Sequence, residues 1–525
     1  MTNSTMQEVT SEWDDTRFHR EKRSGVFMGL GWLQLGYMAA GVAVLLVFYF
    51  ILPFPWSQLV ALAGAAFLFC TAVPTPMGRP LIEWVLFAVV YTLRGAWGFL
   101  RFRREWHKEP VREDDEDADV AERATVDKKG RIKPGKPWRL HLIGEFDELL
   151  VYTMPNGSAF VFDPRKKEII LTARIQTEKA FDLESFESRE SRTRGFKEML
   201  TGVTRLPGIH LASMSDQTTM ISGQHVARWY HNRQNLNGVK TGADVDPFLH
   251  SSLEAAMQRE QGMPVHEMWL TIVVGADDVR NQGKPNKRGI GGLMDAVQST
   301  MNAVEHSVMT SGAEVTTWHT PRSLSALIRG AFDPESSVEI SERTGEREGV
   351  APTSAGPMAV DVHRGYLSTD SGLHRTFMIS EWPQFGARFG FLSELVFLGD
   401  FRHTVTVVMK PREQRKALKS VRGRKATHET SERQRKRWGG VPSLEHAREG
   451  EDLEEEERHL VEGAAALQQV GLVTVTGRDE AELEAHTSTL LTRAPAAGCE
   501  VRPLWWQQDS GFVAAALPLG RIDVR

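Results

Sequence analysis

The chain has 525 residues, a formal net charge of -5 at pH 7 and two cysteines. This length is too great for one compact domain, so we expect two or three domains besides any membrane segment. The net charge excludes no class of partner. Cys70 lies inside an apolar run that we interpret below as membrane-embedded, and Cys499 lies near the far end, so we do not expect them to pair; the absence of a disulfide framework is typical of a reducing cytoplasm.

Two uncharged apolar runs stand near the N-terminus, at residues 35–52 and 56–73, and the turn between them contains Pro53 and Pro55. Each run approaches the roughly 20 residues that a helix needs to cross a bilayer, where lipid offers no hydrogen-bond partner to the backbone. The sequence therefore predicts a transmembrane helical hairpin. The alternative is a pair of helices buried in a large core. No small-residue cleavage site follows the first run, so we interpret it as an uncleaved anchor.

Positive charges flank this predicted hairpin, between Arg17 and Arg23 before it and between Arg79 and Lys108 after it. Because Lys and Arg are retained on the cytoplasmic side, the pattern predicts a multi-pass protein of the inner (cytoplasmic) membrane with both termini in the cytoplasm. A third apolar stretch, Leu81 to Leu100, contains Glu83 and Arg94, whose charges are costly at the centre of a bilayer. We expect this stretch to form a helix along the membrane surface, and a third span is the alternative.

An acidic run at residues 109–122 separates the apolar part from a region in which short strands alternate with helices. If a polar helical excursion at residues 225–261 is set aside, the predicted order of elements is βαββαβ, the ferredoxin-like arrangement, and the same order follows a second time. The predicted fold class is a membrane-anchored α+β protein with an N-terminal transmembrane helical hairpin and two ferredoxin-like βαββαβ modules. The predicted domains are a cytoplasmic tail (1–24), the hairpin with its interfacial helix (25–108), an acidic linker (109–135), the first module (136–334), a linker (335–357) and the second module (358–525) with a charged helical insertion (410–458).

The insertion is the most charged part of the chain. Residues 410–437 contain twelve Lys or Arg and three Glu, and residues 445–457 contain eight acids and one Arg. One interpretation is a helical hairpin whose two arms neutralise each other. The other is a free basic arm that binds the phosphates of nucleic acid or acidic lipid, although Trp438 is the only aromatic residue nearby. The candidate anion-binding residues are Arg415, Lys416, Lys419, Arg422, Arg424, Lys425, Arg433, Arg435, Lys436 and Arg437.

One stretch approaches a catalytic motif. Residues 130–137, GRIKPGKP, have the Gly and Lys spacing of a phosphate-binding loop. However, Pro137 stands where Ser or Thr must reach Mg²⁺, Pro134 lacks an N–H donor, and a predicted strand follows instead of a helix. The histidines show no metal-ligand spacing, and no serine or cysteine has the sequence context of a nucleophile. We therefore predict that the protein is not an enzyme and has no catalytic residues, no metal and no cofactor.

Several stretches resemble known families. The apolar hairpin followed by Gly78-Arg79-Pro80-Leu81 resembles the small PrgI-type membrane proteins of Gram-positive conjugation systems. HTPRSLSALIRGAFDP (319–334), ISEWP (379–383) and QQDSGFVAAALPLG (507–520) resemble the region that precedes the motor domain in VirB-type ATPases of type IV secretion. The whole pattern is similar to actinobacterial membrane proteins that accompany a separate ATPase in conjugation-like gene clusters. The departure from the ATPases is large, because a complete P-loop and a motor domain are missing.

This resemblance implies a non-catalytic inner-membrane component of a type IV secretion or conjugation-like system. The expected partners are a separate P-loop ATPase that docks on a cytoplasmic platform, other membrane subunits and membrane lipid, in an oligomer within a larger complex. Leu517, Pro518, Leu519 and Gly520 are the candidate docking surface for the ATPase, and the alternative is that they are simply the end of the last strand (residues 511–517) and the turn of the second module. Two other functions stay open: a membrane-tethered nucleic-acid-binding protein that uses residues 410–437, and a scaffold subunit of another export apparatus, such as a type VII-like system.

Overall fold

The computed structural model describes residues 32–51, 81–104, 123–128, 131–177, 186–221, 263–282, 289–343, 348–383, 390–437, 444–462 and 466–522, with isolated positions between some of these ranges. The chain forms two compact units. The first contains Met1–Leu100, Ser380–Ala387 and Gln414–Gly463, and the second contains Arg101–Ile379, Arg388–Glu413 and Ala464–Arg525.

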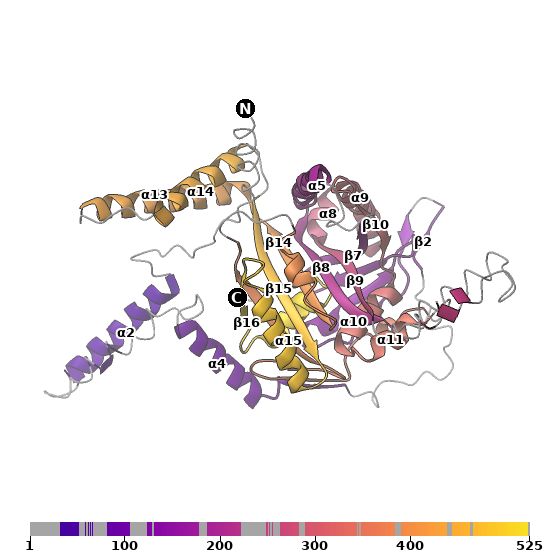
Figure 1. Cartoon of the computed structure of the whole chain (residues 1–525), viewed down its shortest axis with the longest axis horizontal. Coiled ribbons are helices and arrows are strands. Elements are labelled where there is room, and N and C mark those ends of the chain that lie inside the picture. The colour runs from indigo at the N-terminus through magenta and orange to yellow at the C-terminus, as the bar shows by residue number, and fades with distance from the viewer. Residues whose placement is uncertain are drawn as a thin grey trace. The chain divides into compact units, whose positions relative to one another are not determined.

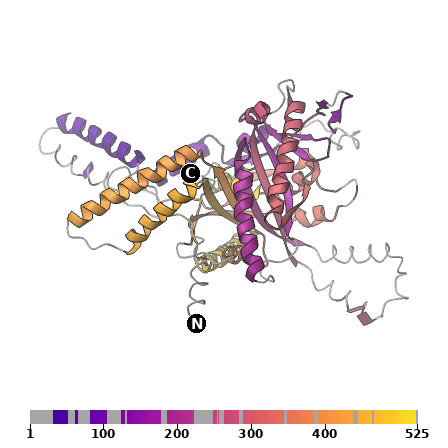
Figure 2. The ribbon, with the colours of Figure 1, turned by 90° about the horizontal axis from the view of Figure 1, so that it is seen from above.

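The described part of the first unit is mostly helical. Helix α2 (Trp32–Ile51) has 20 residues and α4 (Leu81–Ala96) has 16. Both expose large apolar side chains, and α4 has no buried residue. The other two long helices, α13 (Gln414–Arg437) and α14 (Leu444–Val461), lie side by side in both views (Figures 1 and 2).

The predicted transmembrane hairpin is wrong. Across the part of the chain that the structure describes, no helix has both the length and the apolar character needed to cross a membrane. Helix α4 is short and carries Glu83 and Arg94. In α2, Gln34 and Tyr37 interrupt the apolar sequence near its start, so the stretch after them is shorter than the roughly 20 residues of a span. The apolar run at residues 56–73 is described only at isolated positions. The predicted location as a multi-pass protein of the inner membrane is wrong for the same reason, because it depended on these helices.

The second unit is built on one large sheet of 14 strands (Figure 1). Every pairing whose register is described is antiparallel. Its strands are β1 (Arg101–Arg103), β4 (Trp138–Arg139), β5 (Leu150–Thr153), β6 (Ala159–Asp163), β7 (Glu168–Thr177), β8 (Ile209–Ile221), β9 (Met263–Gly275), β10 (Ala313–Trp318), β11 (Ala359–Val362), β12 (Leu367–Ser368), β13 (Leu373–Glu381), β14 (His403–Pro411), β15 (Leu467–Gly477) and β16 (Glu500–Pro503). Strands β2 (Thr125–Val126) and β3 (Ile132–Lys133) form a separate ladder.

Helices of this unit connect and cover the strands. They are α5 (Phe186–Arg205), α8 (Ala276–Gln282), α9 (Ile290–Met309), α10 (Pro321–Phe332), α11 (Ser336–Ser341), α12 (Ser393–Val396), α15 (Glu480–Arg493) and α16 (Gln508–Ala516). Local sequence explains several of their ends. Helix α10, for example, begins with Pro321 after Thr320, whose side chain accepts a hydrogen bond from the backbone N–H of Ser323.

Two βαββαβ runs lie edge to edge in the sheet. The first run, β7 to β10, has the strand order β10-β7-β9-β8, and the second, β13 to β16, has the order β16-β13-β15-β14. They meet where β8 pairs with β14, from Ala212 opposite Met409 to Thr218 opposite His403. The predicted fold class, a membrane-anchored α+β protein with a transmembrane hairpin and two ferredoxin-like modules, is wrong, because no described helix can cross a membrane and the strands of both runs belong to one 14-stranded sheet. Each run alone would leave one long strand with unpaired N–H and C=O groups, and their mutual pairing produces a single sheet.

The two faces of the first run are covered differently. Successive side chains of a strand point to opposite faces. On one face, Leu171 and Ile272 belong to the same buried cluster as Met199 of α5 and Met301 of α9. The opposite face carries Thr172 of β7, which is buried beneath the residues that follow α16.

Residues 511–517, predicted as a strand, mostly form α16. The sequence GFVAAAL is apolar throughout, and a short apolar run does not distinguish a buried strand from a buried helix. Every residue from Gly511 to Ala516 is buried in the structure. The predicted helical excursion at residues 225–261 lies almost entirely outside the described residues.

Candidate functional site

The charged hairpin of α13 and α14 has a small apolar seam. Ala417 and Val421 are buried on α13, and Leu453 and Leu460 are buried on α14. Spacings of four and seven residues place such side chains on one face of each helix. The side-chain amide of Gln414 also donates a hydrogen bond to the carbonyl oxygen of Leu460, at 2.8 Å.

Ion pairs join the basic helix to the acidic one. Arg424 donates to both carboxylate oxygens of Glu456 at 2.7 Å. Arg422 contacts Glu457 at 2.9 Å, and Lys425 contacts the same carboxylate at 3.4 Å. The hydrogen bond from Arg422 lowers the pKa of Glu457 from its ordinary value, and the charge of Lys425 adds to this effect. Arg422 and Lys425 therefore both favour the ionised form of Glu457.

The ten cations proposed from the sequence do not share one environment. Arg415, Lys416 and Lys419 are exposed near the start of α13. Arg422, Arg424 and Lys425 form the ion pairs with α14, and Arg433 lies 3.6 Å from Glu429 of its own helix. Arg435, Lys436 and Arg437 belong to α13, but their side chains lie outside the described residues.

The four residues proposed as a docking surface for an ATPase are buried. Leu517 is 4% exposed and Leu519 is 0% exposed, and Pro518 and Gly520 are buried as well. Gly520 has a φ of +54°, and a Cβ atom there would lie 2.5 Å from Cγ2 of Val273 on β9. The segment therefore packs on the sheet of the first βαββαβ run and presents no exposed side chain.

A row of hydroxyl side chains lies beneath α16 and the residues after it. Thr406 on β14 donates to the carbonyl oxygen of Ala515 at 2.6 Å, and Thr172 on β7 donates to that of Pro518 at 3.1 Å. The last carbonyl groups of a helix have no partner within the helix. The hydroxyl row supplies these partners, so the segment can cross from the second run to the first without leaving its backbone unsatisfied.

Arg521 fixes the far end of this segment. Its guanidinium is 6% exposed and forms ion pairs with Asp163 at the end of β6 and Glu168 at the start of β7. Glu168 also contacts Nδ1 of His210, and Nε2 of His210 contacts Asp278 at 2.9 Å. Partial burial lowers the pKa of His210, but the hydrogen bonds to these two carboxylates raise it overall. Arg521, Asp163 and Glu168 form a clamp in which the guanidinium neutralises the charges of the two carboxylates.

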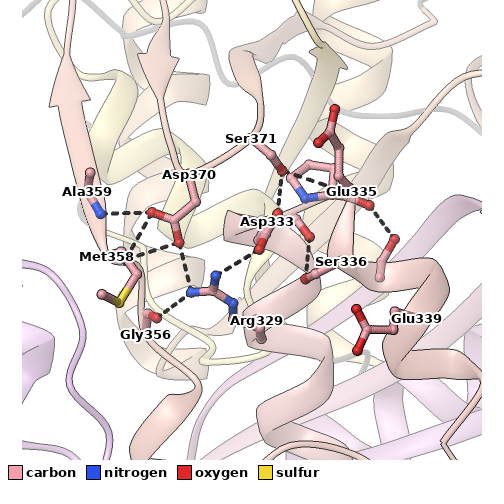
Figure 3. A network of polar contacts seen from close by, with 12 residues as sticks. Arg329, Asp333, Glu335, Ser336, Glu339, Gly356, Met358, Ala359, Asp370 and Ser371 are labelled. Carbon is pink, nitrogen blue, oxygen red and sulfur yellow. Dashed lines mark hydrogen bonds and ion pairs between the residues drawn. The ribbon is translucent and has the colours of Figure 1, made fainter.

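A second polar network surrounds Arg329 at the end of α10 (Figure 3). Its guanidinium contacts Asp333 at 2.7 Å and Asp370 at 2.8 Å, and it donates to the carbonyl oxygen of Gly356 at 3.0 Å. Asp370 in turn accepts hydrogen bonds from the backbone N–H groups of Met358 and Ala359. This network fixes the chain where it passes from the first βαββαβ run to β11.

Other sequence candidates for chemistry are placed as follows. The stretch 130–137 contributes β3, and β4 begins directly after it. Cys499 is buried, and burial raises the pKa of its thiol to about 12. Within the described ranges, no three His, Cys, Asp or Glu side chains are grouped so that they could hold a metal ion.

Sequence reasoning missed both the Arg521 and the Arg329 clusters. Asp163 begins the turn Asp163-Pro164-Arg165 and Glu168 follows it. This pair of acids at adjoining strand ends is the only local signal for the Arg521 cluster. No family model matches the chain, and no curated protein is significantly similar to it.

Proposed function

We propose that this chain is a non-catalytic component of a type IV secretion or conjugation-like system and serves as a docking platform for a separate P-loop ATPase. The resemblance of residues 319–334, 379–383 and 507–520 to the region before the motor of VirB-type ATPases supports this function. Because residues 517–520 are buried, the proposed docking surface is the charged hairpin instead.

One observation carries the proposal. Strands β14 and β15 pair in register up to Pro411 opposite Leu467, and the backbone N–H of Arg412 donates to the carbonyl oxygen of Ala466 at 2.8 Å. A two-residue turn would suffice to connect strands that are paired to this point. The sheet therefore does not require the charged hairpin, which the chain inserts between these two residues.

The surface chemistry of the hairpin suits a protein partner. Arg415 and Lys419 are exposed on α13, and Glu451 and Glu454 are exposed on α14. A surface with both signs of charge can favour one partner and disfavour others through electrostatic complementarity. This property fits a specific docking arm better than a site for one uniformly charged ligand.

A deletion tests the proposal. Residues 413–465 would be replaced by Asn-Gly, which forms a tight turn between paired strands. Tagged full-length and deletion proteins would be purified from the native host, and the products analysed by mass spectrometry and an ATPase assay. We expect a P-loop ATPase to accompany the full-length chain, to account for the measured hydrolysis and to be lost from the deletion variant.

Thermal unfolding of the purified variant provides the control for folding of the sheet. Recovery of the ATPase with the deletion variant would exclude the hairpin as the docking surface. If no P-loop ATPase accompanies the full-length chain, the proposed function is wrong.

The exposed cations Arg415, Lys416 and Lys419 favour nucleic-acid binding as a second candidate function. Such binding would weaken steeply with salt, because phosphate contacts release counterions. Titration of a 30-mer DNA with the full chain and with the variant Arg415→Gln/Lys419→Gln tests it. Equal affinity of both proteins, or no salt dependence, would exclude it; Arg478→Gln, at an exposed position in the other unit, is the matched control.

A further inference from the structure

Strand β10 has one unpaired long edge. Among the described strands it pairs only with β7, from Ala313 opposite Thr177 to Trp318 opposite Ala173. Thr316 has no partner in this register, because the strand bulges between Val315 and Thr317. A bulge reorients backbone groups locally, and an edge strand presents N–H and C=O groups that can pair with another chain.

A hollow of about 340 Å³ is lined by four consecutive residues of β10. Its walls come from β10, from the turn between β5 and β6, from α9 and from the start of α10. The residues that line it are Asn156, Gly157, Ser158, Glu305, Val315, Thr316, Thr317, Trp318 and Thr320. The hollow therefore extends along the strand, as a binding site for an extended chain requires.

The walls of the hollow are held in place by their own hydrogen bonds. The indole N–H of Trp318 donates to Glu305 at 2.6 Å. The side-chain oxygen of Asn156 accepts from the backbone N–H and the hydroxyl of Ser158, at 3.0 and 2.7 Å. Thr320 is fixed as the N-cap of α10. A site whose walls are already ordered loses little conformational entropy when it binds a ligand.

Apart from its bulge, the edge carries no Lys or Pro, and its charged side chain is acidic. The sequence of β10, AEVTTW, contains neither Lys nor Pro, which natural proteins place on edge strands to prevent association. Glu314, Thr316 and Thr317 are exposed. Glu305 stands in the hollow, whereas the nearest cation of the partner strand, Arg174, is already paired with Glu267 at 3.3 Å.

We propose that the outer edge of β10 binds an extended basic peptide segment of a partner protein, which adds to the sheet as a further strand. Backbone hydrogen bonds provide affinity in this mode, and side chains on alternate positions provide specificity. A second copy of the chain fits less well, because its β10 edge carries the same acidic side chain, Glu314, and offers no complementary positive charge. The site goes beyond the proposed function, and it is formed by residues of the second unit alone.

The test uses fluorescein-labelled octapeptides of alternating Lys and Val with the full chain, and fluorescence anisotropy measures their affinity. Two further versions carry N-methyl groups on the amides of odd or of even residues, so that one edge or the other of the added strand cannot donate hydrogen bonds. We expect the unmodified peptide to bind, one methylated version to lose at least tenfold in affinity and the other to retain most of it. Equal affinity of all three peptides, or an equal loss with both methylated versions, overturns the proposal.

Two conservative variants test the location. Glu305→Gln keeps an acceptor for the indole N–H of Trp318, and Glu314→Gln changes only an exposed side chain. We expect each to weaken binding of the Lys-Val peptide two- to fivefold, whereas Glu339→Gln on α11, an exposed acid outside the hollow, leaves it unchanged. Equal affinities of all three variants, or binding of a Glu-Val octapeptide as tight as that of the Lys-Val peptide, would contradict the proposal.

Discussion

The hydroxyl of Thr172 donates a hydrogen bond at 3.1 Å to the carbonyl oxygen of Pro518, which lies 346 residues later in the chain. Thr172 belongs to the first βαββαβ run, and Pro518 follows the last helix of the second. The two runs are thus joined twice, by the pairing of β8 with β14 and by the segment that crosses from α16 to β7. The crossing therefore adds a second connection between the two halves of the sheet, besides their strand pairing.

The first prediction concerns this hydrogen bond. Thr172→Val keeps the shape of the side chain but leaves the carbonyl oxygen of Pro518 without its donor in a buried site. An unsatisfied buried polar group costs about 1–3 kcal/mol, so we expect the free energy of unfolding in urea to fall by about that amount. Thr489→Val, whose hydroxyl bonds the carbonyl of Ala485 on an exposed helix face, is the control and should change stability by less than about 0.5 kcal/mol. Equal effects of the two substitutions would show that the Thr172 contact contributes nothing specific.

The second prediction concerns the clamp at Arg521. Arg521→Met leaves the buried carboxylate of Asp163 without its cation, and it leaves the partly exposed carboxylate of Glu168 with His210 as its remaining partner. Removal of one partner from a buried ion pair costs about 3–5 kcal/mol, because the remaining charge has lost its solvent and its counterion. We expect the unfolding free energy to fall by about this amount in denaturant titrations. In the triple variant with Asp163→Asn and Glu168→Gln, part of the loss should return, and a failure to recover any stability would argue against charge as its cause.

Much of the local structure could be predicted from the sequence because it depends on neighbouring residues. The order of strands and helices in each βαββαβ run, for example, is expected from local patterns and is present in the structure. The sheet could not be predicted in the same way. Pairing of Ala212 with Met409 depends on two edge strands that are far apart in the sequence and carry no mutual signal. Apolar composition also misled the prediction twice, for the membrane hairpin and for residues 511–517, because it does not define the length or type of an element.

The same distinction applies to the candidate sites. The opposite charges of the two arms of the insertion indicated contacts such as that of Arg424 with Glu456, since both lie on helices joined by a short connection. Arg521 and Asp163 are separated by 358 residues, and only the fold brings them together. Burial of residues 517–520 was equally hidden, because an apolar sequence such as Leu-Pro-Leu-Gly suits a core as well as an interface.

The third prediction concerns pH. Burial lowers the pKa of His374 to about 3 and that of His319 to about 4, from an ordinary value of 6.5. In the unfolded chain these histidines gain protons as the pH falls below about 6.5, whereas in the folded chain they stay neutral. Stability therefore decreases from that pH downward, to about pH 4 for His319 and about pH 3 for His374. At about pH 5 each histidine should contribute a loss of about 2 kcal/mol.

A variant isolates this effect from that of His210, whose raised pKa acts in the opposite direction. His374→Gln can still bond the hydroxyls of Thr369 and Thr476, which now contact the two ring nitrogens at 2.8 and 2.9 Å. Its unfolding free energy should decrease less steeply between about pH 7 and pH 5 than that of the unmodified chain. Parallel pH profiles of the two proteins would show that His374 does not titrate as its burial requires.

The fourth prediction concerns the hairpin, where Arg424 and Glu456 are each about one-fifth exposed. Arg424→Glu places two carboxylates together, and the double variant Arg424→Glu/Glu456→Arg restores an opposite-charge pair. For partly exposed pairs we expect effects of about 0.5–1 kcal/mol that decrease at high salt. Hydrogen exchange of residues 414–461 should therefore be faster in the single variant and close to normal in the double variant. If both variants exchange alike, the seam of Val421 and Leu453 rather than the ion pairs holds the two helices together, and the charges remain available for the docking partner.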